Sequence, residues 1–142
     1  MKYNFLGHSG LKVSALGFGA GTLGGKGQIF SAWGNAGQLE ANQMIATCLD
    51  AGVNFFDTAD VYSEGESERI LGTALKPHRQ NSIISTKVSV RTDQQINHVG
   101  FSRHYLIHAV EQSLQRLNAD YIDVLQLHQF DSFTPLEQLM ST

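Results

Sequence analysis

Residues 82–88 read Ser-Ile-Ile-Ser-Thr-Lys-Val, a β-rich run with a lysine next to its end. Short runs of this kind, bounded by polar residues, are typical of strands that are buried on both faces of a sheet. Residues 53–56 form a second run, which leads into Asp57, and residues 121–127 form another, which ends at His128. The chain therefore contains several buried strands that each deliver an ionisable residue at or near the strand end.

Helical patterns separate these strands. Apolar residues recur every three or four positions in residues 38–51, in residues 66–75 and in a longer segment that Ser102 can cap. A shorter buried run, residues 16–19, precedes the first of these helices, and a predicted hairpin of residues 3–15 opens the chain. The predicted order is thus a hairpin followed by β-α-β-α-β-α-β.

Buried strands that alternate with helices predict an α/β fold with parallel pairing and right-handed crossovers. Two architectures fit this order, a doubly wound open sheet and a (β/α)8 TIM barrel. A barrel of about 250 residues spends roughly 31 residues on each βα unit. Asp57 and Lys87 are 30 positions apart, and the longer interval to His128 includes a polar stretch, residues 89–101. The spacing agrees with a barrel.

The end of the sequence indicates an incomplete domain. Thr134, Pro135 and Glu137 have the spacing of a capping box with proline at the first helical position, so a further helix is expected there. A crossover helix normally leads into another strand. Residues 1–142 are therefore interpreted as a single incomplete domain, the hairpin and roughly the first four βα units of a barrel. Such a half-barrel would expose two sheet edges and invite self-association or pairing with a missing C-terminal half.

Composition narrows the class of protein. The 142 residues are 42% hydrophobic and 16% charged, with a formal net charge of −3. This balance is typical of a globular domain, and the scattered basic residues do not predict nucleic-acid binding. The lone cysteine, Cys48, rules out an intrachain disulfide framework and fits a small buried hydrophobe. With no signal-peptide pattern and no apolar run of about 20 residues, a cytoplasmic protein without membrane association is expected.

Four residues form the candidate catalytic group: Asp57, Tyr62, Lys87 and His128. All four follow or end consecutive parallel strands, at the edge where such folds build their sites. The reaction that these four side chains could catalyse is the reduction of a carbonyl group. A phenol, with an ordinary pKa of about 10, can protonate the developing alkoxide if a nearby ammonium favours the phenolate. A carboxylate keeps that ammonium charged, and an imidazole can donate a hydrogen bond to the carbonyl oxygen. No metal is required.

Three sequence blocks around these residues resemble the aldo-keto reductase superfamily. They are the stretch from Asp57-Thr58-Ala59-Asp60-Val61-Tyr62 to Glu68-Arg69-Ile70-Leu71-Gly72, the lysine strand Ser85-Thr86-Lys87-Val88, and the histidine strand of residues 121–128. The blocks arrive in order, and the resemblance covers essentially the whole chain. It implies a TIM barrel in which Tyr62 is the proton donor, Lys87 and Asp57 tune it, and His128 positions the carbonyl.

The resemblance also implies a cofactor and a substrate. An NADP-dependent oxidoreductase that reduces aldehydes and ketones with NADPH is expected, and NADH stays open because the family keeps its phosphate-binding residues beyond this chain. Gly21, Thr22, Leu23 and Asp57 are the predicted cofactor contacts. Two alternatives remain: a non-catalytic cofactor-binding or sensor subunit of the same superfamily, and an inactive truncated fragment.

Three other sequence features have a structural explanation beside a functional one. Residues 19–24 spell GxGxxG after a strand, but the next helix begins only near Gln38, so a Rossmann site is rejected. His104 and His108 lie four apart on a predicted helix, where a solvated pair is favoured over a metal site. Phe30 and Trp33 either line the substrate mouth or belong to a lid that packs on the barrel.

Overall fold

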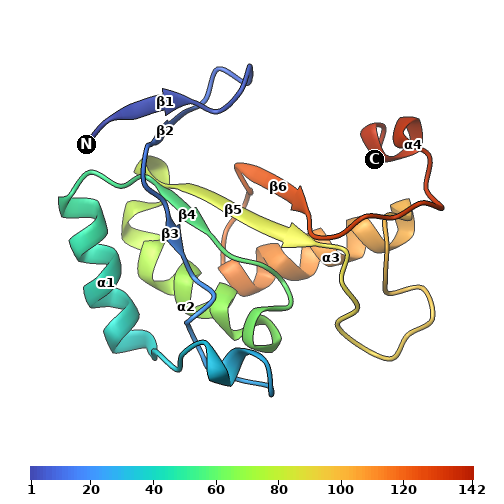
Figure 1. Cartoon of the computed structure of the whole chain (residues 1–142), viewed down its shortest axis with the longest axis horizontal. Helices are drawn as coiled ribbons and strands as arrows, with labels where there is room; N and C mark the ends of the chain where they lie inside the picture. The colour runs from blue at the N-terminus through green and yellow to red at the C-terminus, as the bar shows by residue number, and fades with distance from the viewer.

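A computed structural model describes residues 1–142 and contains two sheets (Figure 1). The hairpin pairs β1 (Tyr3–Phe5) with β2 (Lys12–Ser14) in antiparallel fashion. The second sheet has the order β3-β4-β5-β6, and every neighbouring pair is parallel. Its strands are β3 (Phe18–Gly19), β4 (Phe55–Asp57), β5 (Ile83–Val88) and β6 (Val124–Leu127). Spatial order thus follows chain order, with β3 and β6 at the two edges.

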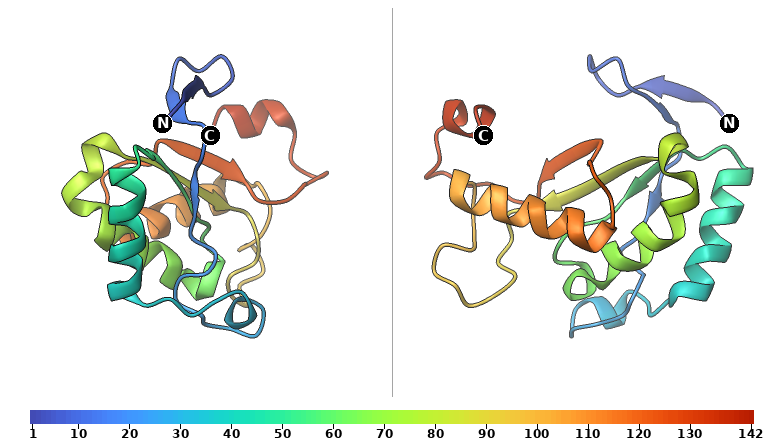
Figure 2. Two further views of the ribbon diagram at one scale, coloured as in Figure 1. Left: turned by 60° about the vertical axis from the view of Figure 1, so that its left-hand side comes forward. Right: turned by 180° about the vertical axis from the view of Figure 1, so that it is seen from behind.

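Three long helices cover one face of this sheet (Figures 1 and 2). They are α1 (Gln38–Asp50), α2 (Glu66–Leu75) and α3 (Arg103–Leu117), with α2 packed between the other two. A doubly wound sheet would carry helices on both faces. Sequential parallel strands with all crossover helices on one side instead form an arc of a barrel. The chain is completed by the short helix α4 (Leu136–Met140) and by the 3-10 turns η1 (Phe30–Ala32), η2 (Tyr62–Gly65) and η3 (Lys76–Asn81).

Most predicted elements are confirmed, but three strands begin two or three residues later than predicted. β4 begins at Phe55 rather than at residue 53. β3 contains only the second half of residues 16–19, and β6 begins at Val124 rather than residue 121. In the approach to β6, the backbone N–H of Asp123 still donates to the carbonyl oxygen of Ile84. Side chains supply the other bonds: Asp123 accepts from the backbone N–H of Ile84, and Arg79 donates to the carbonyl oxygen of Tyr121. The expected Ser102 cap is present, because its hydroxyl accepts from the Tyr105 N–H at 3.3 Å.

The capping box predicted at Thr134 is wrong. The Thr134 hydroxyl donates instead to the Asp131 carboxylate at 2.8 Å. Pro135 occupies the N-cap position rather than the first helical position, and no side chain caps α4. A nearby carboxylate thus competes successfully for the hydroxyl that the sequence pattern assigns to the helix N-terminus.

The main hydrophobic core lies between the sheet and α1, α2 and α3. Phe56, Ile45, Leu71 and Ile84 are almost completely buried there. Gly72 sets the distance between α2 and α3, because a Cβ added to it would lie 2.0 Å from a backbone oxygen of α3. Such close packing fixes the helices against one face of the sheet and leaves the other face open. None of the helices is both long enough and apolar enough to span a membrane.

The open face of the sheet holds a hollow of 540 Å³. Asp57, Lys87 and Gln126 line it together with the backbone of residues 17–19. The hairpin is tied to the amino-terminal end of β4, where the Asn54 side chain accepts from the Ser14 N–H at 2.7 Å. The hollow therefore corresponds to the inside of a barrel, with the hairpin at the end opposite the candidate catalytic residues.

Candidate active site

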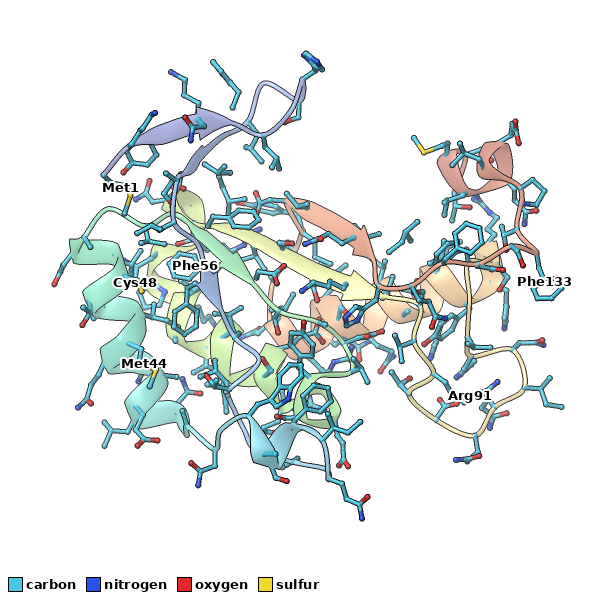
Figure 3. The ribbon with its side chains drawn as sticks, in the orientation of Figure 1. Met1, Met44, Cys48, Phe56, Arg91 and Phe133 are labelled. Carbon is cyan, nitrogen blue, oxygen red and sulfur yellow. The ribbon has the colours of Figure 1, made fainter.

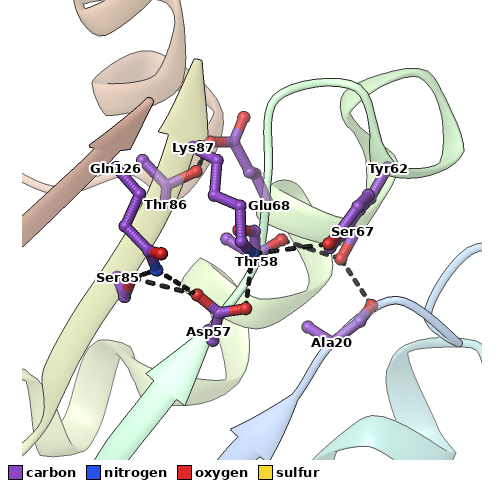
Figure 4. Close-up of polar contacts among 10 residues, drawn as sticks. All are labelled: Ala20, Asp57, Thr58, Tyr62, Ser67, Glu68, Ser85, Thr86, Lys87 and Gln126. Atoms are coloured by element: carbon purple, nitrogen blue, oxygen red, sulfur yellow. Dashed lines mark hydrogen bonds and ion pairs between the residues drawn. The ribbon is translucent and has the colours of Figure 1, made fainter. Parts of the chain in front are cut away.

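The candidate catalytic side chains converge at the carboxyl ends of β4, β5 and β6. Figure 4 shows three of them, Asp57, Tyr62 and Lys87. Asp57 is the last residue of β4 and Lys87 the next-to-last of β5. Tyr62 begins η2, five positions beyond β4, and His128 directly follows β6. The structure therefore brings together all four residues that the sequence singles out.

Lys87 occupies the centre of the group. Its ammonium lies 2.5 Å from Oδ2 of Asp57, 2.8 Å from the carbonyl oxygen of Thr58 and 3.4 Å from the phenol oxygen of Tyr62. The side chain is only 14% exposed. A partly buried ammonium needs such partners to stay charged, and here two oxygens of the β4 end supply them. The same contacts aim its third donor direction at the Tyr62 phenol.

Tyr62 is positioned by an unusual backbone turn. Ser63 (φ 50°) and Glu64 (φ 58°) both adopt the left-handed conformation, and Gly65 (φ 82°) continues it. Left-handed non-glycine residues cost roughly 1–3 kcal/mol each, so the surroundings must hold them in place. The buried Ser63 hydroxyl does so by donating to the carbonyl oxygen of Leu23 at 2.7 Å. The turn returns the phenol of Tyr62 to the end of the sheet.

His128 completes the group on the β6 side. Its ring lies against that of Tyr62, with centroids 5.6 Å apart and an edge-to-face angle of 76°. Burial keeps the pKa of His128 below the ordinary histidine value, the Lys87 ammonium lowers it further, and Asp57 opposes the shift. The imidazole is therefore neutral at pH 7 and can donate one hydrogen bond from its ring. Its Nδ1 is buried without a partner. Its backbone N–H donates to the carbonyl oxygen of Val88 and to the hydroxyl of Ser89.

Two residues that the sequence analysis missed fix the orientation of Asp57. Ser85 donates to Oδ1 of Asp57 at 3.0 Å, and the amide of Gln126 donates to the same oxygen at 2.9 Å. Gln126 also reaches the Ser85 hydroxyl at 2.6 Å. With Oδ1 held by these donors, Oδ2 is left to the Lys87 ammonium (Figure 4). A polar residue at the inward positions of β5 and β6 was the available signal.

A second network lies beneath the site, between the sheet and the helices. Glu68 is completely buried, and its two oxygens accept from Thr86 and from the guanidinium of Arg116, each at 2.6 Å. Nearby, the Ser67 hydroxyl donates to the carbonyl oxygen of Ala20 at 2.7 Å and contacts Thr58. These bonds join α2 and α3 to the strand ends that carry the candidate catalytic residues.

The glycine-rich first loop borders the site. A Cβ on Gly21 would meet the Trp33 ring at 3.2 Å and the Tyr62 ring at 3.9 Å, and Thr22 is exposed. Leu23 is completely buried in the main core, so its side chain does not face the open site. No helix begins at residue 24, which agrees with the rejection of a Rossmann fingerprint.

The aromatic residues of this loop stand beside the phenol. The centroid of Phe30 lies 5.4 Å from that of Tyr62, and the centroid of Trp33 lies 6.1 Å from it. The histidine pair on α3 does not meet: His104 is exposed, whereas His108 stacks on His98 with centroids 4.6 Å apart. Phe30 and Trp33 therefore contribute to the rim of the site, and His104 and His108 do not.

The sequence model of the Aldo/keto reductase family matches residues 15–142. The chain belongs to this family. Among its aldo-keto reductase relatives, YhdN from Bacillus subtilis is 33% identical over 97% of this chain and 41% of that protein. A probable voltage-gated potassium channel subunit beta from Arabidopsis thaliana is 40% identical over 97% of this chain and 40% of that protein. The chain spans about two-fifths of the length of these relatives.

A solved aldo-keto reductase agrees with the fold. The holo form of AKR11C1 from Bacillus halodurans matches with a TM-score of 0.82 and 37% identity, over 99% of this chain and 44% of that one. The predicted TIM-barrel class is thereby confirmed, and the chain supplies part of the barrel. The family assignment also confirms the resemblance seen in the three sequence blocks. The roles of the individual residues stay predictions.

Proposed function

We propose that the protein containing this chain reduces aldehydes and ketones to alcohols with NADPH, and that Tyr62 is the proton donor. The observation that carries the proposal is the contact of Lys87 with both Asp57 and the Tyr62 phenol, at 2.5 and 3.4 Å. The neutral His128 ring beside the phenol supports it. Membership of the Aldo/keto reductase family supports an oxidoreductase.

The residues present fit the reactive end of a nicotinamide cofactor. The hollow next to Asp57 and Lys87 has a volume of 540 Å³, and a Cβ on Gly19 would meet no atom within 4 Å, so the backbone there is open to a ligand. Gly21, Thr22 and Asp57 are the proposed contacts, while Leu23 can contribute only backbone atoms. When bound, NADPH supplies the hydride.

Each residue of the group has one proposed task. His128 donates a hydrogen bond that orients the substrate carbonyl oxygen near the phenol. As the carbonyl carbon gains the hydride, the Tyr62 hydroxyl gives its proton to that oxygen, which yields the alcohol and a phenolate. The Lys87 ammonium stabilises the phenolate, and Asp57 keeps the ammonium charged. Water returns a proton to Tyr62 for the next cycle.

The test uses a longer form of the protein that completes the barrel. NADPH oxidation with 4-nitrobenzaldehyde is followed by absorbance, for the parent and for Tyr62→Phe. The variant is expected to lose turnover, because phenylalanine has no proton to donate. Tyr121→Phe is the matched control, since Tyr121 is exposed and stacks only under Arg79. Unchanged turnover in Tyr62→Phe would contradict the mechanism. Running the assay with NADH in place of NADPH decides the cofactor.

A second function is favoured by one comparison. Several relatives at 36–40% identity are named as probable or putative voltage-gated potassium channel beta subunits. A subunit of this kind would use the cofactor as a ligand rather than as a consumed substrate. Tight NADPH binding with negligible turnover of any aldehyde would favour this second function, and steady turnover would favour the reductase.

The 142 residues alone are proposed to be weakly active or inactive. β6 has an unpaired edge, and the segment that follows it exposes Phe130 at 88% and Phe133 at 94% (Phe133 is labelled in Figure 3). Exposed edges and apolar patches favour pairing with another chain. We expect dimers or aggregates in size exclusion. A soluble, monomeric and active 142-residue chain would refute this expectation. A reducing, cytoplasmic setting is proposed as well, and the single half-buried cysteine suits it.

A further inference from the structure

A second pocket, of 580 Å³, lies on the side of the active site that faces α3. Residues of the first loop, of the η2 turn, of residues 91–93 and of α3 enclose it. Phe30 belongs to its lining and also contacts the Tyr62 ring, so the pocket adjoins the catalytic group without including it. Its volume is within the range of about 300–1,000 Å³ that is usual for small-molecule sites.

The pocket contains a buried carboxyl group, that of Asp60, which lacks a hydrogen bond. The residue lines the pocket, is only 3% exposed, and its Oδ1 has no hydrogen-bond partner. Its backbone N–H is bound to the carbonyl oxygen of Lys87 at 3.0 Å, which fixes the residue at the strand end. A buried polar atom without a partner costs about 1–3 kcal/mol. The position is thus prepared for a hydrogen-bond donor that the chain itself does not provide.

The charges around Asp60 favour a cation. The neighbouring Glu68 is neutralised by Arg116 at 2.6 Å, and Asp93 is paired with His98 at 2.6 Å. Asp60 and Glu64, which both line the pocket, form no ion pair. Two arginines also line the pocket. Arg116 is the one paired with Glu68, and backbone carbonyl oxygens of its own loop hold the guanidinium of Arg91, the nearest being that of Gln95 at 2.5 Å.

The rest of the lining is suited to an apolar group. Phe30 and Tyr105 contribute aromatic rings, and Val61 and Ala109 contribute aliphatic carbon. Aromatic rings attract ammonium groups by about 0.5–2 kcal/mol and also pack against hydrocarbon tails. A ligand with a cationic head and a short apolar tail would therefore match both parts of the pocket.

We propose that this pocket is a second ligand site, in which the Asp60 carboxylate binds the primary ammonium group of a small organic cation whose apolar part packs against Phe30 and Tyr105. Glu64 lies at the same pocket and adds a second negative charge. The site is independent of the proposed reduction, since it needs neither the cofactor nor the carbonyl substrate.

The electrostatics of Asp60 agree with this assignment. Burial raises the pKa of Asp60 to about 7 and the Glu68 carboxylate raises it as well, against a lowering by Arg116 and by the Val61 backbone N–H. The charged groups that face it are Glu68 and Arg116. Burial raises the pKa of Tyr105, and the charge of Asp60 raises it as well. A bound ammonium would supply the counter-charge that Asp60 lacks and stabilise its ionised form.

The test is isothermal titration calorimetry at pH 8 on the longer protein that completes the barrel, with no cofactor present. The probe is 2-phenylethylammonium, compared with neutral 2-phenylethanol and anionic phenylacetate. We expect one site that prefers the ammonium to both other probes by at least tenfold in Kd. Asp60→Asn should weaken ammonium binding at least tenfold. The pocket-filling variant Gln112→Trp should abolish it, because Gln112 lines the pocket.

Two controls separate this site from other possibilities. Asp50→Asn changes an exposed carboxylate at the end of α1 and should leave binding unchanged. Tyr62→Phe should also bind the ammonium normally, so loss of turnover with intact binding overturns only the proposed reductase function. Equal affinity for the three probes, or full affinity in Asp60→Asn or Gln112→Trp, would overturn the ammonium site. Absence of saturable binding in the parent would overturn it as well.

Discussion

Asp57 and Asp60 are three positions apart on one strand end, yet their surroundings are opposite. Asp57 is contacted by the Lys87 ammonium, the Ser85 hydroxyl and the Gln126 amide. Asp60 is more deeply buried and has an oxygen with no partner at all. The first carboxyl faces the inside of the barrel, and the second faces the pocket beside α3.

Two carboxyl groups of one short motif therefore have different surroundings and different roles. A partly exposed carboxylate with three donors is held in one orientation and can in turn hold a lysine. A buried carboxyl with one unpartnered oxygen is poised to respond to pH or to a ligand. Glu68 stands between these cases, because it is completely buried but fully paired. We therefore expect effects on activity at the partners of Asp57, largest at Lys87, and effects on stability at the groups around Asp60.

The largest effect is expected for Lys87→Met in the completed barrel. Loss of the ammonium removes the cation beside the Tyr62 phenol and leaves Asp57 without its ion pair. We expect kcat for 4-nitrobenzaldehyde to fall about 10³-fold, in the range usual for acid-base groups. Lys26→Met is the control, because Lys26 is exposed and contacts only Glu66. Comparable kcat values for the two variants would remove Lys87 from the mechanism.

Asp60→Asn should change how stability depends on pH. The pKa of Asp60 is about 7 in the folded chain against an ordinary 3.8, so folding favours its protonated form. The resulting stabilisation is fully present below about pH 4 and is lost as pH rises through about 7, by at most about 4 kcal/mol. In urea unfolding, the free energy of unfolding of the variant should therefore rise relative to that of the parent as the pH is increased from 5 to 8. Parallel pH profiles of the two proteins would show that Asp60 does not titrate in this way.

Arg116→Leu should have the next largest effect, a decrease in the free energy of unfolding. The substitution leaves the completely buried Glu68 carboxylate without its counter-ion, which costs about 3 kcal/mol. Arg103→Leu is the matched control, because Arg103 is exposed at the start of α3 and reaches only carbonyl oxygens near the chain end. Equal midpoints of urea unfolding for the two variants would mean that Glu68 does not depend on this pair.

The smallest effect is expected for Gln126→Leu. Asp57 then loses one donor to Oδ1 but keeps Ser85, so its orientation is loosened rather than lost. A hydrogen bond worth about 1 kcal/mol corresponds to a decrease in kcat of roughly fivefold. Gln115→Leu, on the exposed side of α3, should leave kcat unchanged. A variant as slow as Lys87→Met would mean that Gln126 takes part in the chemistry directly.

The sequence was sufficient for the fold and for the four residues at the strand ends. Helical and strand periodicities are local, and the 30-residue interval between Asp57 and Lys87 carries the barrel repeat. Ser85 and Gln126 were missed because a polar residue inside a strand run looks like ordinary alternation. Their meaning depends on register, which places Lys87 beside Gln126 across β5 and β6.

The pocket at Asp60 could not be read from the sequence. Its walls come from the first loop, η2, residues 91–93 and α3, and their meeting depends on how α2 packs on α3. The predicted capping box of α4 was wrong for a related reason, because Asp131 competes for the Thr134 hydroxyl. Contacts between distant segments, rather than local preference, decide both outcomes.

The central claim is that Tyr62 donates the proton in carbonyl reduction, and a single-turnover experiment tests it most directly. The completed barrel is loaded with NADPH and mixed rapidly with 4-nitrobenzaldehyde, while cofactor affinity is measured on the same samples by fluorescence. Tyr62→Phe should bind NADPH as tightly as the parent, and its rate of NADPH oxidation should be at least about 100-fold lower. A rate within about threefold of the parent, with NADPH bound equally well, would contradict the claim.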